Sequence, residues 1–251
     1  RLRVTLGVRA DMPIFGDTPE NREFNNTTIP LIEDEGYDLR GARIGQFIKP
    51  QLMFSPRLGF NYDVTGDQKT ILRGGVGIFT SRVPLVWPGG AYNNFGLNIG
   101  YARDFGAIFE PDINNQIPGD IDPNNVEPTG SIDLFAEDFK VPQVLKFNVA
   151  MDRQLPGGFV ANLDLLYNRT IRNVAYQNVN LKQSVENLTG TGDDRPYFDR
   201  RDEIDDSYGR IVLGYNTNEG YSYNATASIS KQFGNGLFAS LAYSFGDSYA
   251  V

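Results

Sequence analysis

The sequence contains neither cysteine nor histidine. Without cysteine the chain can form no disulfide, no thiolate nucleophile and no thiolate metal site. Without histidine the usual serine, cysteine and zinc mechanisms lose their general base or a metal ligand, which leaves carboxylate, lysine or tyrosine chemistry for an enzyme. We therefore expect a protein that is not an enzyme and that holds no resident cofactor.

A long hydrophobic run is also missing, since no stretch of the 251 residues approaches the ~18 apolar residues that a membrane-spanning helix requires. If the chain enters a membrane, it must do so with β-strands. The first residue is Arg1, and no charged segment followed by an apolar one comes after it, so there is no signal peptide to read. The absence of a readable signal peptide leaves the cellular location open. The length of the chain suits one large β domain.

A surplus of positive charge is absent as well, because the formal net charge is −8. Three long segments, 10–52, 81–142 and 169–220, hold 26 of the 31 acidic residues but 14 of the 23 basic ones. Nucleic-acid binding needs lysine and arginine clustered on an exposed face, so we expect no nucleic-acid partner. Acidic segments of this kind are also typical of plain solvated loops.

What the sequence does contain is pairs of strands joined by very short turns. Residues 56–80 alternate apolar with polar or glycine positions on both sides of the segment 65–68, Thr-Gly-Asp-Gln, whose residues tolerate a tight reversal. Each arm is about ten residues long, which exceeds a typical soluble strand but suits a tilted strand that crosses a bilayer. The segment is therefore predicted to be a β-hairpin.

The same pattern occurs twice more. Residues 143–168 predict a second hairpin with its turn at Pro156–Gly158, and residues 221–245 predict a third with its turn at Gly234–Gly236. Residues 1–9 alternate as a single strand. The sequence thus predicts an all-β fold, an antiparallel up-and-down transmembrane β-barrel segment of about seven strands in sequential order, and residues 1–251 as part of one barrel domain.

The connections between these strands alternate between short and long. Sequential antiparallel order places the turns at Gly66–Asp67, Pro156–Gly158 and Gly234–Gly236 on one side and the segments 10–52, 81–142 and 169–220 on the other. Outer-membrane barrels show this asymmetry, with short periplasmic turns and long extracellular loops. The composition of 10–52, with its scattered prolines, predicts loop rather than any regular element.

The alternation also assigns two faces to the predicted sheet. Apolar residues at one set of positions are expected to face lipid, among them Phe60, Val76, Phe147, Leu163, Ala227 and Leu241. Polar residues at the other set are expected to line a wet lumen, among them Asn61, Arg73, Lys146, Asn148, Asn162, Asn224 and Ser228. The outer membrane of a Gram-negative bacterium is the location that these features predict.

The sequences of the predicted hairpins resemble those of TonB-dependent outer-membrane receptors. The motifs are Ser-Pro-Arg-Leu-Gly-Phe at 55–60 with Tyr62, a short Gly-Asp turn, and Leu-Arg-Gly-Gly-Val-Gly at 72–77. The stretch from Asn216 to Ser244, which spans most of the third hairpin, is similar to the Oar-like branch common in Bacteroidetes. The resemblance implies a barrel of twenty-two strands, a plug domain and remaining strands outside this chain, and energy supplied through the TonB complex.

Two further groups are candidates for binding. Trp87, Tyr92, Phe95 and Tyr101, in the second long segment, could stack on a ligand at the barrel mouth or pack the loop onto itself. Asp120, Asp122 and Asn124 have the alternate spacing of a calcium loop, but Val126 and Ser131 depart from the later ligand positions, so calcium is a weak candidate. The acidic pairs of 193–206 predict a salt-bridged surface rather than glycosidase acids.

Two function classes remain open. The favoured one, under the resemblance, is TonB-dependent active import of a large ligand such as a peptide or a protein-derived nutrient. The alternative is a non-transporting surface barrel that acts as an adhesin or as part of a secretion or motility assembly. The expected partners are outer-membrane lipid, the TonB complex through a plug domain, and a peptide or protein ligand or a surface lipoprotein.

Overall fold

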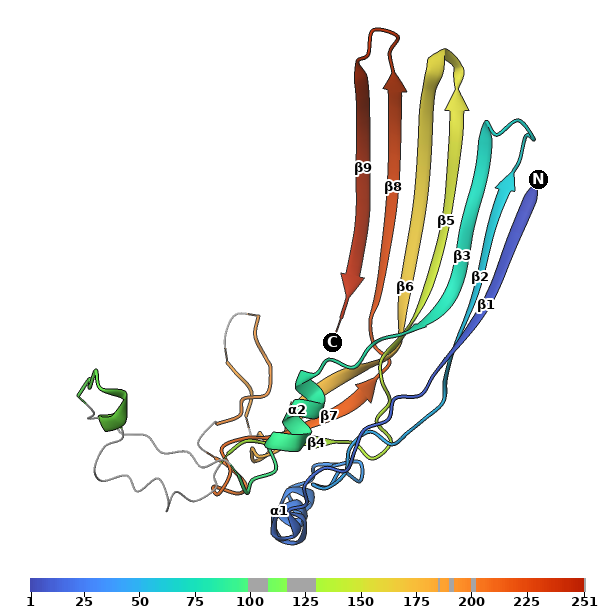
Figure 1. The fold of residues 1–251 in the computed structure, drawn as a ribbon. Helices are drawn as coiled ribbons and strands as arrows, with labels where there is room; N and C mark the ends of the chain where they lie inside the picture. Colours follow the sequence, from blue (N-terminus) through green and yellow to red (C-terminus); the bar gives the residue numbers. More distant parts are fainter. Residues whose placement is uncertain (99–107, 117–129, 185, 190–191, 200–201, 251) are drawn as a thin grey trace.

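The computed structural model describes residues 1–98, 108–116, 130–184, 186–189, 192–199 and 202–250. Seven long strands form one open sheet, which we call the wall (Figure 1). Each wall strand pairs antiparallel with the next one along the chain. The sequence-based prediction of the strands and their order is confirmed. The strands are β1 (Leu2–Asp11), β2 (Met53–Asp63), β3 (Thr70–Thr80), β5 (Gln143–Leu155), β6 (Phe159–Asn178), β8 (Tyr221–Gln232) and β9 (Phe238–Tyr249).

The register of the wall keeps apolar positions opposite one another. Val76 pairs with Leu58 on one side and with Phe147 on the other, and Leu163 pairs with Ala227. Because side chains alternate along a strand, one face of the wall carries the apolar set across every strand. Many of its large side chains are exposed, and Leu241 is 73% exposed. All six residues predicted to face lipid lie on this face.

The three short turns lie together at one end of the wall, as predicted (Figure 1). The turns span 64–69, 156–158 and 233–237, and the second is a 3₁₀ turn, η2 (Pro156–Gly158). Gly157 and Gly158 have φ of 75° and 77°, which is the left-handed conformation that glycine adopts without steric cost. In the first turn, Asp63 Oδ1 accepts a hydrogen bond from the Gly66 amide at 2.9 Å.

The long segments fold into a second body at the opposite end, which we call the loop layer. It contains α1 (Arg22–Asp34), α2 (Val86–Asn93), β4 (Ile132–Phe135) and β7 (Ile211–Thr217), with the coil that joins them. The last residues of β6 extend beyond the wall and pair antiparallel with β7, which pairs parallel with β4. These two short strands add to the predicted seven. A short 3₁₀ helix, η1 (Ile113–Asn115), also lies in the second long segment.

Helix α1 shows that the prediction of 10–52 as loop without regular elements was wrong. The Asn21 side chain caps the helix by accepting a hydrogen bond from the Phe24 amide at 3.0 Å. Pro30 lies inside the helix, where proline costs about 3 kcal/mol. Burial of Phe24, Ile29 and Ile32 on one face offsets that cost. Among the described residues, no helix is long and apolar enough to cross a membrane.

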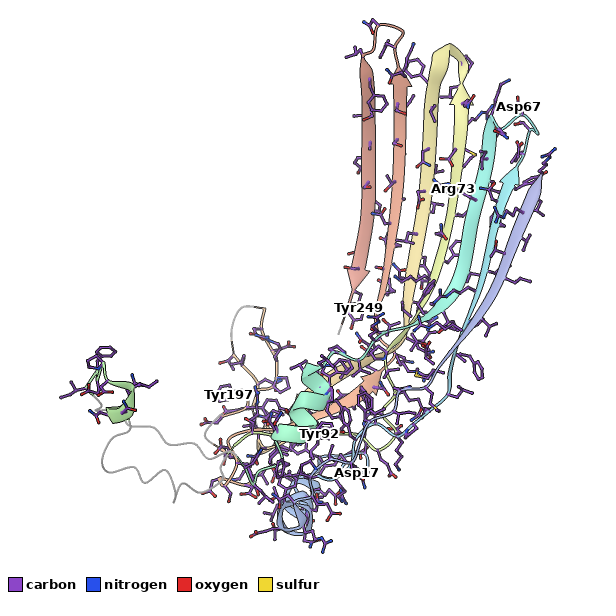
Figure 2. The ribbon with its side chains drawn as sticks, viewed as in Figure 1. Asp17, Asp67, Arg73, Tyr92, Tyr197 and Tyr249 are labelled. Atoms are coloured by element: carbon purple, nitrogen blue, oxygen red, sulfur yellow. The ribbon has the colours of Figure 1, made fainter. Side chains whose placement is uncertain are left out.

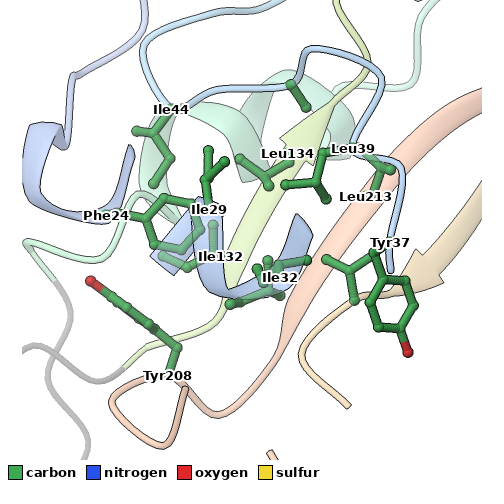
Figure 3. Packing of buried hydrophobic residues seen from close by; sticks show 13 residues of the cluster. Phe24, Ile29, Ile32, Tyr37, Leu39, Ile44, Ile132, Leu134, Tyr208 and Leu213 are labelled. Carbon is green, nitrogen blue, oxygen red and sulfur yellow. The ribbon is translucent and has the colours of Figure 1, made fainter. Parts of the chain in front are cut away.

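The buried core of the chain lies in the loop layer. One cluster packs α1 against β4 and β7, with Phe24, Ile32, Ile132 and Leu213 at its centre (Figure 3). A second cluster joins Phe135 and Phe139 to residues of the other two long segments. Among the described residues, every buried hydrophobic side chain except Met53 and Ala150 belongs to this layer. In the described part of the chain, the two clusters therefore join parts of all three long segments into one packed body.

Candidate functional site

The polar face of the wall is the first candidate site. The ladder places Asn61 opposite Arg73 and Asn162 opposite Ser228, and alternation puts the other predicted lumen residues on the same face. The structure therefore brings all of them to one side of the sheet, away from the apolar face. The set is Asn61, Arg73, Lys146, Asn148, Asn162, Asn224 and Ser228. A lumen is the function we propose for this face.

An ion pair lies on this polar face, toward the end of the wall that carries the short turns (Figure 2 labels Arg73). Arg73 Nε donates to Asp152 Oδ2 at 2.8 Å, and Asn162 Nδ2 donates to Asp152 Oδ1. The pair joins neighbouring strands β3 and β5, and Asn162 adds β6. The sequence analysis did not predict the pair, because strand register fixes which residues meet across a sheet.

The remaining polar residues make weaker contacts. Lys146 Nζ lies 5.7 Å from the ring centre of Phe79 on the neighbouring strand β3. Arg57 Cζ, on the other neighbour β2, lies 4.4 Å from the same ring centre. Asn224 Oδ1 accepts a hydrogen bond from Thr226 Oγ1 at 2.8 Å. Lys146 and Asn224 are exposed. These exposed side chains give this face its polar character.

The aromatic candidates of the second long segment separate into packing residues and one pocket residue. Tyr92 donates its hydroxyl to the Gly16 carbonyl at 2.7 Å, and Phe95 packs against the first core cluster. Both side chains make contacts within the loop layer, and Figure 2 shows Tyr92 there. Tyr101 lies outside the described residues.

Trp87 differs because its ring borders a pocket. It stands edge-on to Phe139 with ring centres 5.9 Å apart and edge-on to Tyr176 at 6.4 Å. The pocket has a volume of about 310 Å³ between α2 and the β4–β7 strands. Its lining residues come from four separate elements, α2, β4, β6 and β7: Val86, Trp87, Asp133, Leu134, Phe135, Tyr176 and Val212.

Asp133 supplies the charge of this pocket. Its Oδ2 accepts a hydrogen bond from Asn94 Nδ2 at 2.6 Å, and its amide donates to the Asn94 carbonyl at 3.1 Å. Tyr176 lies in the part of β6 that extends beyond the wall. Partial burial, and then the nearby Asp133 carboxylate, raise the pKa of Tyr176 to about 12. Sequence analysis missed both residues, since no local pattern connects them to Trp87.

The third long segment contains part of the predicted salt-bridged surface. Arg195 pairs with Asp193 at 2.8 Å and Lys182 with Asp202 at 2.6 Å. Asp205 has a different environment, because it accepts a hydrogen bond from the buried Thr28 at 2.5 Å. Elsewhere in the layer, Lys49 lies 2.6 Å from Glu137 and lowers the pKa of that carboxyl. The Thr28–Asp205 and Lys49–Glu137 contacts each join two different long segments, whereas the other two ion pairs lie within the third segment.

The residues of the predicted calcium site, Asp120, Asp122 and Asn124, lie outside the described residues. Within the part of the chain that the structure describes, no group of three or more acidic side chains is placed to hold a metal ion.

Comparison with known proteins gives one family and one solved structure. The family model described as "Outer membrane beta barrel domain" matches residues 1–250. The outer membrane transporter YddB from Escherichia coli is similar over 79% of this chain, with 11% sequence identity and a TM-score of 0.43. The chain spans 20% of the length of that transporter. No curated protein sequence matches the chain.

Proposed function

Because the chain belongs to the outer membrane beta barrel domain family and is located in the outer membrane, we propose that it forms part of a TonB-dependent active transporter. The transported ligand is a large one, such as a peptide or a protein-derived nutrient. The wall contributes the lipid-facing strands and a polar lumen surface. The loop layer stands at the extracellular mouth and captures the ligand there. The proposal assigns the chain no enzymatic activity.

The observation that carries this proposal is the position of the loop layer. The described parts of all three long connections lie at one end of the wall, and all three short turns lie at the other (Figure 1). Outer-membrane barrels place short turns in the periplasm and long connections outside the cell. The layer therefore meets a ligand before the lumen does, and its acidic surplus favours basic ligands over anionic ones.

Uptake by whole cells tests the proposal. Cells that carry the full-length gene, cells with the gene deleted, and a TonB-deficient strain would be given a fluorescently labelled protein digest. We expect uptake only in the first strain, with surface binding retained in the TonB-deficient strain. Unchanged uptake without TonB would overturn the transport proposal. Surface binding without any gene-dependent uptake would instead support an adhesin or an assembly component.

Removal of the whole segment 87–137 is a poor test of ligand capture. That deletion removes Ile132, Leu134 and Phe135 from the two core clusters, so the loop layer would unfold. Point variants on the exposed side of the layer separate capture from folding.

A further inference from the structure

The pocket between α2 and the β4–β7 strands has apolar, aromatic walls that stay open to solvent. The Trp87 ring packs edge-on against Phe139, and the Tyr176 side chain is 50% exposed. Val86, beside them on α2, is 74% exposed. Gly214 lies between Phe135 and Tyr176, where an added Cβ would come within 2.8 Å of the Phe135 ring. The glycine thus lets both rings reach the pocket.

The acidic group of the pocket has no basic partner within the described residues. Asp133 is bound by the neutral Asn94 amide, and no lysine or arginine of the described chain lies within 4.0 Å of its carboxylate. Asp152 on the wall is the opposite case, since Arg73 neutralises it. A partly buried carboxylate beside aromatic rings attracts a cation, because desolvation weakens its competing contacts with water.

The backbone of α2 fixes where this carboxylate lies. Gly90, inside α2, faces the Asp133 side chain so closely that an added Cβ would overlap its carboxylate. At Gly89, one position earlier, an added Cβ would meet no heavy atom within 4 Å. The close approach of Gly90 therefore positions the Asp133 carboxylate, and Gly89 offers a matched control.

We propose that this pocket binds the side chain of a lysine or arginine carried by a peptide ligand. The apolar stem of that side chain lies against Trp87 and Tyr176, and its cationic head pairs with Asp133. Long basic side chains commonly bury their stems on apolar surface and place their charge at a polar group. A ring face also attracts the cation. This inference rests on the proposed import function and names its ligand class.

Binding of short peptides to the purified full-length protein tests the inference. The probes are acetyl-Gly-Lys-Gly-amide, the same peptide with norleucine in place of lysine, and the free diamine 1,5-diaminopentane. Calorimetry gives the affinity. Fluorescence of Trp87, the single tryptophan of this sequence, reports contact at the pocket once any tryptophan elsewhere in the full-length protein is replaced by phenylalanine. We expect the lysine peptide to bind at least about tenfold tighter than the norleucine peptide, a free-energy difference of roughly 1.4 kcal/mol.

Variants then locate the binding. Asp133→Asn should weaken binding of the lysine peptide about tenfold and leave the norleucine peptide unchanged, whereas Asp138→Asn, an exposed acid of the same layer, should change neither. Gly90→Ala should weaken binding of the lysine peptide, because it displaces the carboxylate, and Gly89→Ala should not. Equal affinity of the parent and Asp133→Asn proteins for the lysine peptide would overturn the inference. Equal affinity for the diamine and for the lysine peptide would contradict the assignment of a peptide as the ligand.

Failure here is distinguishable from failure of the transport proposal. The binding assay needs no energy source, so a TonB-deficient strain supplies protein with the same affinities. Lysine-dependent binding without TonB-dependent uptake would contradict transport alone. Uptake that survives Asp133→Asn and Gly90→Ala, together with unchanged affinities, would contradict the pocket alone.

Discussion

The wall and the loop layer are stabilised in different ways by one chain. The wall has period-two alternation, continuous strand ladders and large apolar side chains that are exposed, such as Leu241 at 73%. The loop layer has short elements and side chains such as Phe24 and Ile132, which are fully buried. A hydrophobic core stabilises the layer in water, whereas the exposed apolar face of the wall requires lipid. The two regions should therefore respond differently to the same kind of substitution.

The largest expected effect is the loss of a core ring from the layer. Phe24→Ala should remove about 3–5 kcal/mol from the stability of the layer, because Phe24 is completely buried and packs on Tyr208 at 5.3 Å. Limited proteolysis should then cleave within 22–34 while the wall keeps its β-sheet circular dichroism. Leu31→Ala, on the exposed side of the same helix, is the control. Equal cleavage of both variants would contradict a packed layer.

A charge on the lipid face should have the next largest effect. Val76→Arg should destabilise the barrel by about 2–4 kcal/mol if Val76 lies near the bilayer midplane. Urea titration of the full-length protein folded into lipid vesicles measures this loss. Asn148→Arg, on the polar face, should be tolerated. Gly75 is an unsuitable control, because a Cβ there would lie 2.9 Å from the Leu58 carbonyl. Equal loss for both arginine variants would refute the two-faced wall.

Loss of the helix cap should have a smaller effect, limited to the layer. Asn21→Ala removes the hydrogen bond to the Phe24 amide and the one from Asn21 Nδ2 to the Phe95 carbonyl. We expect a loss of about 0.5–2 kcal/mol, typical of an N-cap. Hydrogen exchange should increase in the first turn of α1 and stay unchanged in β3. Faster exchange throughout the wall would indicate that the two regions unfold together.

The smallest expected effect concerns the ion pair on the polar face. Asp152→Asn keeps the side-chain shape and removes the charge that faces Arg73. Both partners are partly exposed, so we expect a change of only about 0–1 kcal/mol in the same vesicle titration. Asp152→Leu should cost more if the face is wet, since Arg73 and Asn162 would both lose their acceptor. A gain in stability from Asp152→Leu would place this face in lipid.

The wall could be predicted from the sequence because its signals are local. Alternation such as Leu58, Phe60 and Tyr62, followed by turn residues, defines both a strand and its faces without knowledge of distant contacts. The ladder then brought all predicted lumen residues to one side. The Arg73–Asp152 pair could not be predicted in the same way, because its partners lie 79 residues apart.

The loop layer could not be predicted because its stability comes from contacts between distant segments. The prolines and polar residues of 10–52 indicate loop, and only burial of Phe24 and Ile32 against β4 and β7 makes the helix stable. The candidate pocket shows the same limit. Trp87 was recognised as a binding candidate, but Asp133 and Tyr176 join it only after the second and third long segments pack together.

Surface labelling of intact cells tests the central claim, that the loop layer lies outside the outer membrane and the short turns lie inside it. This sequence has no cysteine, so single cysteines can be placed at Arg22 in α1 and at Asn235 in the last turn, with any cysteine elsewhere in the full-length protein replaced by serine. A membrane-impermeant maleimide should label Arg22→Cys in intact cells. It should label Asn235→Cys only after the outer membrane is permeabilised. Labelling of Asn235→Cys and protection of Arg22→Cys in intact cells would contradict the account.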